Sequence, residues 1–233
     1  LQNTLKMTKI ILKKGREDSL LRFHPWVFSG AIAQIVGEPA EGDIVGVFSQ
    51  GGDFLAYGHY QIGSIAVRVL SFAGEDVLSP DFWKNMIARA LRVRVAVGLA
   101  CPVSSAAEPV SPAAEPVSPA AEPVSPVAEP VSPVAEPVSP VAEPVEATGL
   151  VREHALTNCY RLIHGEGDGL PGLIIDYYDG VCVMQAHSVG MFRAKGAICE
   201  ALKSVYGPSL KAVYDKSSGT APFKAGLDLV DGY

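Results

Sequence analysis

The sequence predicts a mainly β fold combined with an α+β fold: a small N-terminal β-barrel, followed by a small α+β domain of strand-strand-helix-strand-strand order. Short β-branched and aromatic runs recur before residue 75, a proline-rich repeat divides the chain, and strand and helix patterns resume after the repeat. The predicted parts are a leader (1–7), the barrel (8–75), a helix of the second domain (79–100), a disordered insert (101–150) and the α+β domain (151–233).

The barrel is predicted from five short strands in about 65 residues, a number typical of a closed or half-closed barrel. They are Lys9–Leu12, Trp26–Ile35, Asp43–Ser49, Phe54–Gln61 and Ile65–Phe72. Glycine and proline punctuation, such as Gly37-Glu38-Pro39, separates them. Met7 opens the first strand segment, so two interpretations of Leu1–Lys6 stay open: upstream sequence or part of the protein.

A helix is predicted from Pro80, with Ser79 as its cap and the proline in its first turn. One apolar face at helical spacing comprises Phe82, Met86, Ala90, Val93 and Val97. The helix also carries four basic residues, Lys84, Arg89, Arg92 and Arg94. Arg89 and Arg92 share a face of it. Basic residues are common on exposed helix faces, so a solvated face is the favoured interpretation and RNA contact is the alternative.

The insert consists of six seven-residue units over Ser104–Val145, from SSAAEPV to SPVAEPV. Its prolines exclude a coiled coil, so an extended, solvated linker is expected. Each Pro-Val-Ser-Pro formally matches a proline-recognition ligand, but no Arg or Lys lies beside it. The net charge of the chain is −6, yet Ser104–Glu146 holds seven Glu and no basic residue, so 19 basic and 18 acidic side chains remain elsewhere. The acidity therefore does not exclude a nucleic-acid partner.

The α+β domain is predicted from the pattern after the insert. The expected strands are Tyr160–Ile163, Gly172–Tyr178, Val181–His187, Lys211–Asp215 and Leu227–Val230, and the expected helix is Met191–Tyr206. Asp179-Gly180 is typical of a two-residue hairpin turn. No βαβ repeat is long enough for a complete doubly wound domain.

The candidate RNA contacts lie in the N-terminal segment, where Leu1–Gly30 holds six basic and two acidic residues. We select Lys14, Arg16, Arg22, His24 and Trp26. Planar side chains of this kind stack on unpaired bases and bridge phosphates. In the alternative interpretation, Trp26 and Phe28 are core residues and the charges form a solvated face.

No catalytic or metal-binding residues are predicted. Gly167–Gly172 matches G-x-G-x-x-G, but it leads into a β-type segment rather than a helix, so a dinucleotide site is rejected. Glu166, Asp168 and Asp176 are interpreted as turn formers, and the five histidines as structural. The four cysteines (Cys101, Cys159, Cys182 and Cys199) form no C-x-x-C pair, which argues against zinc and disulfides. No apolar run is long enough to cross a membrane and no secretory signal is present, so no membrane partner and a cytoplasmic location are expected.

Three segments carry a resemblance to a known family: Lys13–Gly30 (KKGREDSLLRFHPWVFSG), Tyr160–Asp176 (YRLIHGEGDGLPGLIID) and Tyr214–Ser218 (YDKSS). They resemble the bacterial PUA-domain-containing ribosomal RNA cytosine-C5 methyltransferases, class I enzymes that depend on S-adenosylmethionine and act on large-subunit rRNA. The resemblance implies a PUA-like RNA-binding barrel, a middle α+β domain and a Rossmann-like methyltransferase domain.

The resemblance also sets expectations about activity. The chain stops at Asp231-Gly232-Tyr233 without a terminating feature, so the Rossmann-like domain is expected to be missing and the middle domain truncated before it. C5 methylation needs a cysteine nucleophile and an S-adenosylmethionine site, so this chain alone is expected to bind no cofactor and to be inactive. Ribosomal RNA is the expected partner, and a homodimer is an assembly left open.

The leading hypothesis is the RNA-binding and substrate-positioning portion of a 23S rRNA cytosine-C5 methyltransferase. One alternative is a stand-alone RNA-binding adaptor without catalysis, in which the repeat is a functional spacer. Another is an unrelated enzyme whose site lies in the Gly165–Gly172 loop.

Overall fold

The computed structural model describes residues 8–72, 77–101, 157–222 and 225–232. The predicted leader and, apart from Cys101, the predicted insert lie outside the described residues. The described residues belong to one compact unit, in which they form two sheets with separate cores.

The N-terminal sheet has six strands in the order β2-β6-β5-β4-β1-β3. They are β1 (Lys9–Leu12), β2 (Trp26–Phe28), β3 (Ile32–Val36), β4 (Ile44–Phe48), β5 (Phe54–Tyr60) and β6 (Ile65–Phe72). Their inward side chains form one core that includes Ile10, Leu12, Val27, Val45, Val47, Val67 and Val69. Val27 of the edge strand β2 shares this core with β1 and β4, so the sheet curls around it while the edges β2 and β3 stay unpaired with each other. The barrel is therefore half-closed.

Two features of the barrel differ from the sequence prediction. The expected strand Trp26–Ile35 is interrupted by a 3₁₀ turn, η1 (Ser29–Ala31), because β2 pairs with β6 whereas β3 pairs with β1. The chain thus crosses from one edge of the sheet to the other within this segment. A short helix, α1 (Asp18–Leu21), lies between β1 and β2 and was not predicted.

Helix α2 (Phe82–Ala96) lies within the predicted span, but its buried face differs. The buried side chains are Phe82, Met86, Ile87, Ala90 and Leu91. Val93 is 49% exposed and Val97, beyond the last helical residue, is 61% exposed. The predicted cap is also wrong, because Asp81 is the N-cap and its side chain makes no capping bond. Helix α2 packs against both α4 and β7, which turns its buried face toward Ile87 and Leu91.

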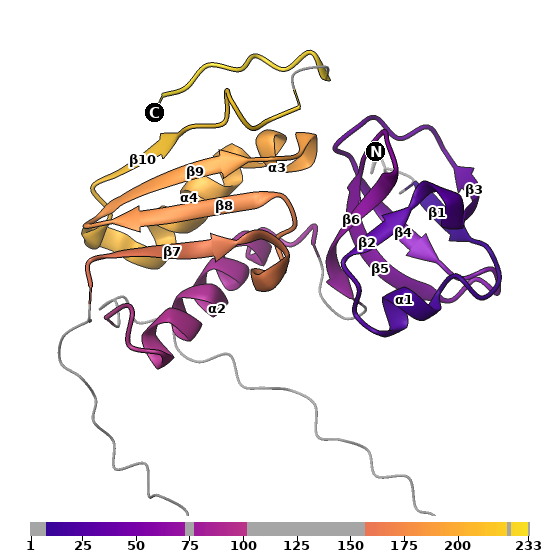
Figure 1. Cartoon of the computed structure of the whole chain (residues 1–233), viewed down its shortest axis with the longest axis horizontal. Coiled ribbons are helices and arrows are strands. Elements are labelled where there is room, and N and C mark those ends of the chain that lie inside the picture. The colour runs from indigo at the N-terminus through magenta and orange to yellow at the C-terminus, as the bar shows by residue number, and fades with distance from the viewer. Residues whose placement is uncertain (1–7, 73–76, 102–156, 223–224, 233) are drawn as a thin grey trace, which may run out of the picture. The chain divides into compact units, whose positions relative to one another are not determined.

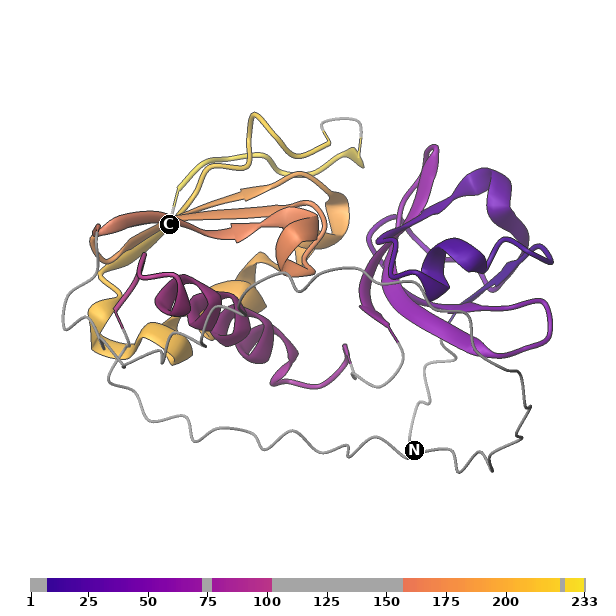
Figure 2. The same cartoon turned by 60° about the horizontal axis from the view of Figure 1, so that its bottom comes forward.

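The second sheet has the order β10-β9-β8-β7. Its strands are β7 (Cys159–His164), β8 (Leu173–Tyr178), β9 (Val181–Ala186) and β10 (Ala212–Asp215), and its helices are α3 (Val189–Arg193) and α4 (Lys195–Tyr206). Strands β7, β8 and β9 are antiparallel, whereas β9 and β10 are parallel and are joined through α3 and α4. Helices α2 and α4 cover the same face of this sheet (Figure 1, Figure 2).

The turns and ends of this sheet test further predictions. The predicted Asp179-Gly180 hairpin turn is confirmed: both residues have positive φ (46° and 93°), as a type I′ turn requires. The predicted helix Met191–Tyr206 instead begins at Val189, where Ser188 accepts the Met191 N–H, and Ala194 divides it into α3 and α4. The strand predicted at Leu227–Val230 is absent among the described residues, and only Gly232 pairs with Asp215.

His59 lies where the barrel meets helix α3. It is a residue of β5 with 4% exposure, and its ring lies 6.4 Å from that of Trp83. Its Nδ1 has no hydrogen-bond partner among the described residues. Burial lowers the pKa of His59 from 6.5 to about 4, so the ring is neutral in the folded chain near pH 7.

This burial predicts a pH dependence of stability. Between pH 6.5 and 4 the unfolded chain binds a proton that the folded chain does not, so the free energy of unfolding falls as the pH falls through this window. The full loss is about 3 kcal/mol, since each pKa unit is worth about 1.4 kcal/mol. Urea unfolding from pH 7 to 4 measures it, with His59→Gln as the control lacking the group. Identical pH profiles for the two proteins would contradict the prediction.

Candidate nucleic-acid interface

The structure places the predicted RNA contacts along the connection from β1 through α1 to β2. Lys14, Arg16, Arg22 and His24 are exposed, and Trp26 is half-buried. Arg16 lines a cavity of about 380 Å³ together with Phe28. Lys14 lines a different cavity, beside Gln50 and Asp53 of the β4–β5 turn. Lys14 and Arg16 therefore line different cavities.

An aromatic cluster lies beside these charges. The His24 ring is 5.7 Å from that of Trp26 and 6.1 Å from that of Phe28, and the Trp26 and Phe28 rings are 6.3 Å apart. Phe28 is 47% exposed, so the interpretation of it as a core residue is wrong. The outward side chains of β2 thus offer aromatic surface next to the basic residues, a combination suited to unpaired bases.

Trp26 also forms a hydrogen bond within the protein, to Glu166. Its indole N–H donates to Glu166 at 2.9 Å, and Arg68 pairs with the same carboxylate oxygen at 3.2 Å. The Arg68 guanidinium also lies 5.8 Å from the centre of the Trp26 ring. Trp26 therefore links β2 to the loop after β7, and only its remaining surface is available to a ligand.

Phe23 was missed by sequence reasoning. Its N–H donates to Leu20 and the His24 N–H donates to Ser19, the two bonds of a Schellman motif at the end of α1. The motif places Phe23 at φ 61°, where glycine is usual and other residues cost roughly 1–2 kcal/mol. The side chain is nevertheless 71% exposed, with one edge-to-face contact to Phe72 at 5.3 Å.

The Gly165–Gly172 loop joins β7 to β8 and contains a 3₁₀ turn, η2 (Gly165–Asp168). A dinucleotide fingerprint opens an α-helix, whereas this loop runs into strand β8, as the sequence predicts. Asp168 accepts two bonds of 2.7 Å from Arg94, and the His164 N–H also donates to it. This loop therefore lies fixed against α2 through its acidic residue, a role that the interpretation as a turn former did not include.

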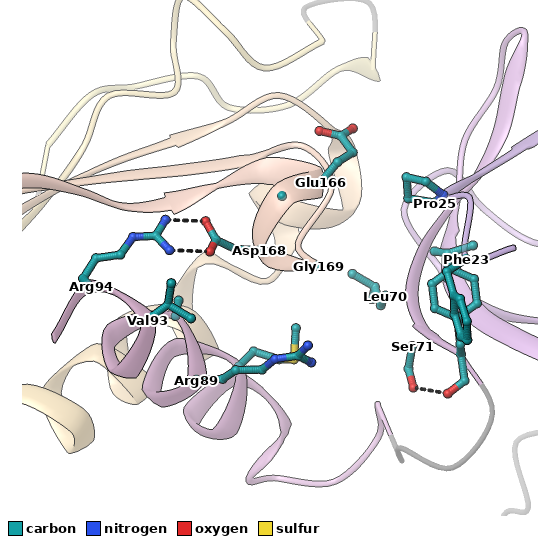
Figure 3. A pocket seen from close by; sticks show the side chains of 15 residues that line it. Phe23, Pro25, Leu70, Ser71, Arg89, Val93, Arg94, Glu166, Asp168 and Gly169 are labelled. Atoms are coloured by element: carbon teal, nitrogen blue, oxygen red, sulfur yellow. Dashed lines mark hydrogen bonds and ion pairs between the residues drawn. The ribbon is translucent and has the colours of Figure 1, made fainter. Parts of the chain in front are cut away.

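A cavity of about 600 Å³ lies among α2, η2 and the barrel residues Phe23 and Phe72. Figure 3 shows the paired Arg94 and Asp168 on one side of it, the Arg89 side chain extending from α2, and Phe23 on the barrel side. We call it the α2 cavity. Arg89, which the sequence interpretation left on a solvated face, is exposed and lines this cavity.

Two cysteines of the second domain, Cys182 and Cys199, have the environment of inert thiols. Cys182 is fully buried in β9, and burial raises its pKa to about 12. Burial also raises the pKa of Cys199, which lies half-buried in α4. A thiol that stays protonated at neutral pH is a poor nucleophile, so the interpretation of these two residues as structural agrees with their surroundings.

Comparisons with known proteins assign a class to the barrel. Residues 10–72 match a family of PUA-like domains. The chain is 28% identical to ribosomal RNA large subunit methyltransferase I of Escherichia coli over 225 residues, which are 96% of the chain. The identity to the Klebsiella pneumoniae protein of the same name is also 28% over 225 residues. The chain spans 43% and 42% of the lengths of these relatives. It carries a PUA-like domain and is homologous to these methyltransferases.

Two solved structures share the fold. A putative SAM-dependent methyltransferase from Streptococcus mutans aligns with 91% of this chain and 41% of its own length, with a TM-score of 0.57 and 14% identity. A putative methyltransferase solved in complex with SAH aligns with 94% of this chain and 41% of its own, with a TM-score of 0.58 and 13% identity.

These matches correct one part of the predicted fold class. The prediction that a Rossmann-like methyltransferase domain is missing from this chain is not supported. The alignments with methyltransferases cover 91–96% of the chain and run through the β7–β10 sheet and its helices. The prediction equated a methyltransferase fold with a long βαβ repeat. The sequence predicts the strand, helix and strand of this segment in the correct order, but not that β9 and β10 pair side by side in parallel. The expectations that this chain binds no cofactor and is inactive depended on the same premise and lose their support.

The carboxyl ends of the parallel strands are the place where an α/β sheet commonly holds a ligand. Here Asp215 accepts from Lys195 at 3.0 Å and from Ser217, and the Ser217 hydroxyl accepts from the Ala186 N–H. These polar groups already bond to one another, so none of them is assigned to S-adenosylmethionine. Within the described ranges, no group of three or more His, Cys, Asp or Glu side chains is placed to hold a metal ion.

Among the described helices, none has the length and apolar character of a membrane span.

Proposed function

We propose that this chain is the RNA-binding and substrate-positioning part of an S-adenosylmethionine-dependent methyltransferase that modifies cytosine C5 in large-subunit ribosomal RNA. The proposal places the protein in the cytoplasm, where its RNA partner is found. The homology to large subunit methyltransferases and the PUA-like domain support it. The cytosine-C5 chemistry follows from the resemblance of the Lys13–Gly30 and Tyr160–Asp176 segments. Homodimer formation stays a prediction.

One observation carries the RNA-binding part of this proposal. Exposed Arg16, Arg22 and His24 lie on the same connection as the exposed Phe28 ring. Guanidinium groups bind phosphate, and exposed rings stack on bases, so this surface combines both requirements of unpaired RNA recognition. Lys14 contributes charge at the margin of this surface.

Charge reversal tests the proposal. The variant Arg16→Glu/Arg22→Glu is expected to weaken binding of a single-stranded rRNA fragment at least about tenfold, measured by fluorescence anisotropy. The slope of log K against log salt concentration is expected to become less steep by roughly 0.7 for each phosphate that the variant no longer neutralises. The variant Lys203→Glu/Lys211→Glu makes the same change in net charge on exposed side chains of the second domain. Equal affinities for the two variants would contradict an RNA-binding role of the barrel segment.

A further inference from the structure

We propose that the α2 cavity binds one unstacked nucleotide of single-stranded RNA, with the base on Phe23 and the phosphate on Arg89. The inference rests on the proposed RNA-binding function and assigns a specific subsite to it. At about 600 Å³, the cavity falls within the range of about 300–1,000 Å³ that is usual for small-ligand sites.

The base-binding wall is Phe23. Its ring is 71% exposed, and Phe72 holds it in an edge-to-face contact, which leaves a face of the ring available. The backbone position is one where glycine is usual, so a large aromatic residue occupies it against the local backbone preference. Leu70 and the 49% exposed Val93 complete an apolar lining. Unpaired bases are recognised by stacking on surfaces of this kind.

The phosphate-binding group is Arg89. Two of the other charged lining residues, Arg94 and Asp168, pair with each other, and Glu166 pairs with Arg68. Arg89 has no acidic partner among the described residues, so it leaves the lining with an uncompensated positive charge. Figure 3 shows it extending from α2 on the side of the cavity opposite Phe23. A planar guanidinium is well suited to bind a phosphate through two hydrogen bonds.

The chain itself connects this subsite to the proposed RNA surface. Phe23 lies directly between Arg22 and His24, two of the predicted RNA contacts. A strand that follows the basic segment therefore reaches the mouth of the cavity without leaving the protein surface. This continuity favours a nucleotide within an RNA strand over a free small molecule.

The matched variants Arg89→Gln and Arg92→Gln test the phosphate contact in the full chain. Both arginines are exposed on α2, but only Arg89 lines the cavity. With a single-stranded RNA oligonucleotide, Arg89→Gln is expected to raise the Kd at least about tenfold, because it removes the charge-assisted hydrogen bonds to the phosphate. Arg92→Gln is expected to raise the Kd less than about twofold. Equal effects of the two substitutions would overturn the proposal.

The variant Phe23→Gly tests the base contact, because it removes the whole side chain while glycine accepts the positive φ. An oligonucleotide carrying 2-aminopurine is expected to lose its binding-induced fluorescence change with this variant, while the urea midpoint of the protein is retained. An unchanged signal would refute the base contact. If Arg16→Glu/Arg22→Glu weakens RNA binding but Arg89→Gln and Arg92→Gln change the Kd equally, only the subsite is refuted. If Arg16→Glu/Arg22→Glu binds RNA as tightly as the unmodified chain, the proposed function itself is refuted.

Discussion

Replacement of Arg94 by methionine is expected to lower the free energy of unfolding by about 3–5 kcal/mol, the usual cost of removing one partner from a buried ion pair. The Arg94 and Asp168 side chains are only 13% and 8% exposed, and two bonds of 2.7 Å join them. Arg94 also donates to the Arg161 carbonyl at 2.9 Å. The variant leaves a buried carboxylate that retains only the His164 N–H as a partner among the described residues.

Urea denaturation measures this loss, and Lys203→Met supplies the control. Lys203 pairs with Glu200 at 2.7 Å, but the two side chains are 62% and 73% exposed, so the expected loss is below about 1 kcal/mol. The double variant Arg94→Met/Asp168→Leu is expected to recover part of the stability, because no unpaired charge stays buried. A loss from Arg94→Met as small as that from Lys203→Met would show that the pair does not hold the η2 loop to α2.

Replacement of Gly190 by alanine is expected to lower the free energy of unfolding by about 2–3 kcal/mol through overpacking. An added Cβ would lie 2.2 Å from Cγ of His59, whose ring is buried and has no room to retreat. Helix propensity alone predicts the opposite sign, since alanine is favoured over glycine in a helix by about 0.8–1 kcal/mol. The steric term is larger, so the contact between the barrel and α3 should weaken.

Gly196→Ala is the matched control for this substitution. Gly196 lies in α4, and an added Cβ there meets no heavy atom within 4 Å. Its expected effect on the thermal midpoint is neutral or an increase of a few degrees, whereas Gly190→Ala should lower the midpoint by roughly 4–12 °C for a domain of this size. If both substitutions raised the midpoint, the close packing of His59 on α3 would be wrong.

Local patterns in the sequence were sufficient to place most strands and both long helices. The Asp179-Gly180 turn and the alternating residues of β8 and β9 are signals carried by neighbours in the chain. The buried face of α2 was placed less well, because the choice among Val93, Ile87 and Leu91 depends on where α4 packs. The parallel pair β9 and β10 was overlooked for the same reason: pairing between distant segments leaves no local pattern.

In the candidate site, too, local sequence features were predictable and contacts between distant residues were not. The exposed basic residues were visible as a local excess of charge, but the pairing of Arg94 with Asp168 joins residues 74 apart in the sequence, on either side of the insert. Phe23 carried no signal either, since its exposure depends on the left-handed backbone at the end of α1. Its position between Arg22 and His24 was the one available indication.

Ultraviolet crosslinking of the chain to a large-subunit rRNA fragment, with mass-spectrometric mapping of the crosslinked peptides, tests the central claim most directly. Aromatic residues next to bases are expected to crosslink, so we expect crosslinks concentrated in the Lys13–Phe28 segment, at Phe23 and Phe28 in particular. Crosslinks confined to the β7–β10 sheet and its helices, with none in that segment, would contradict RNA recognition by the barrel.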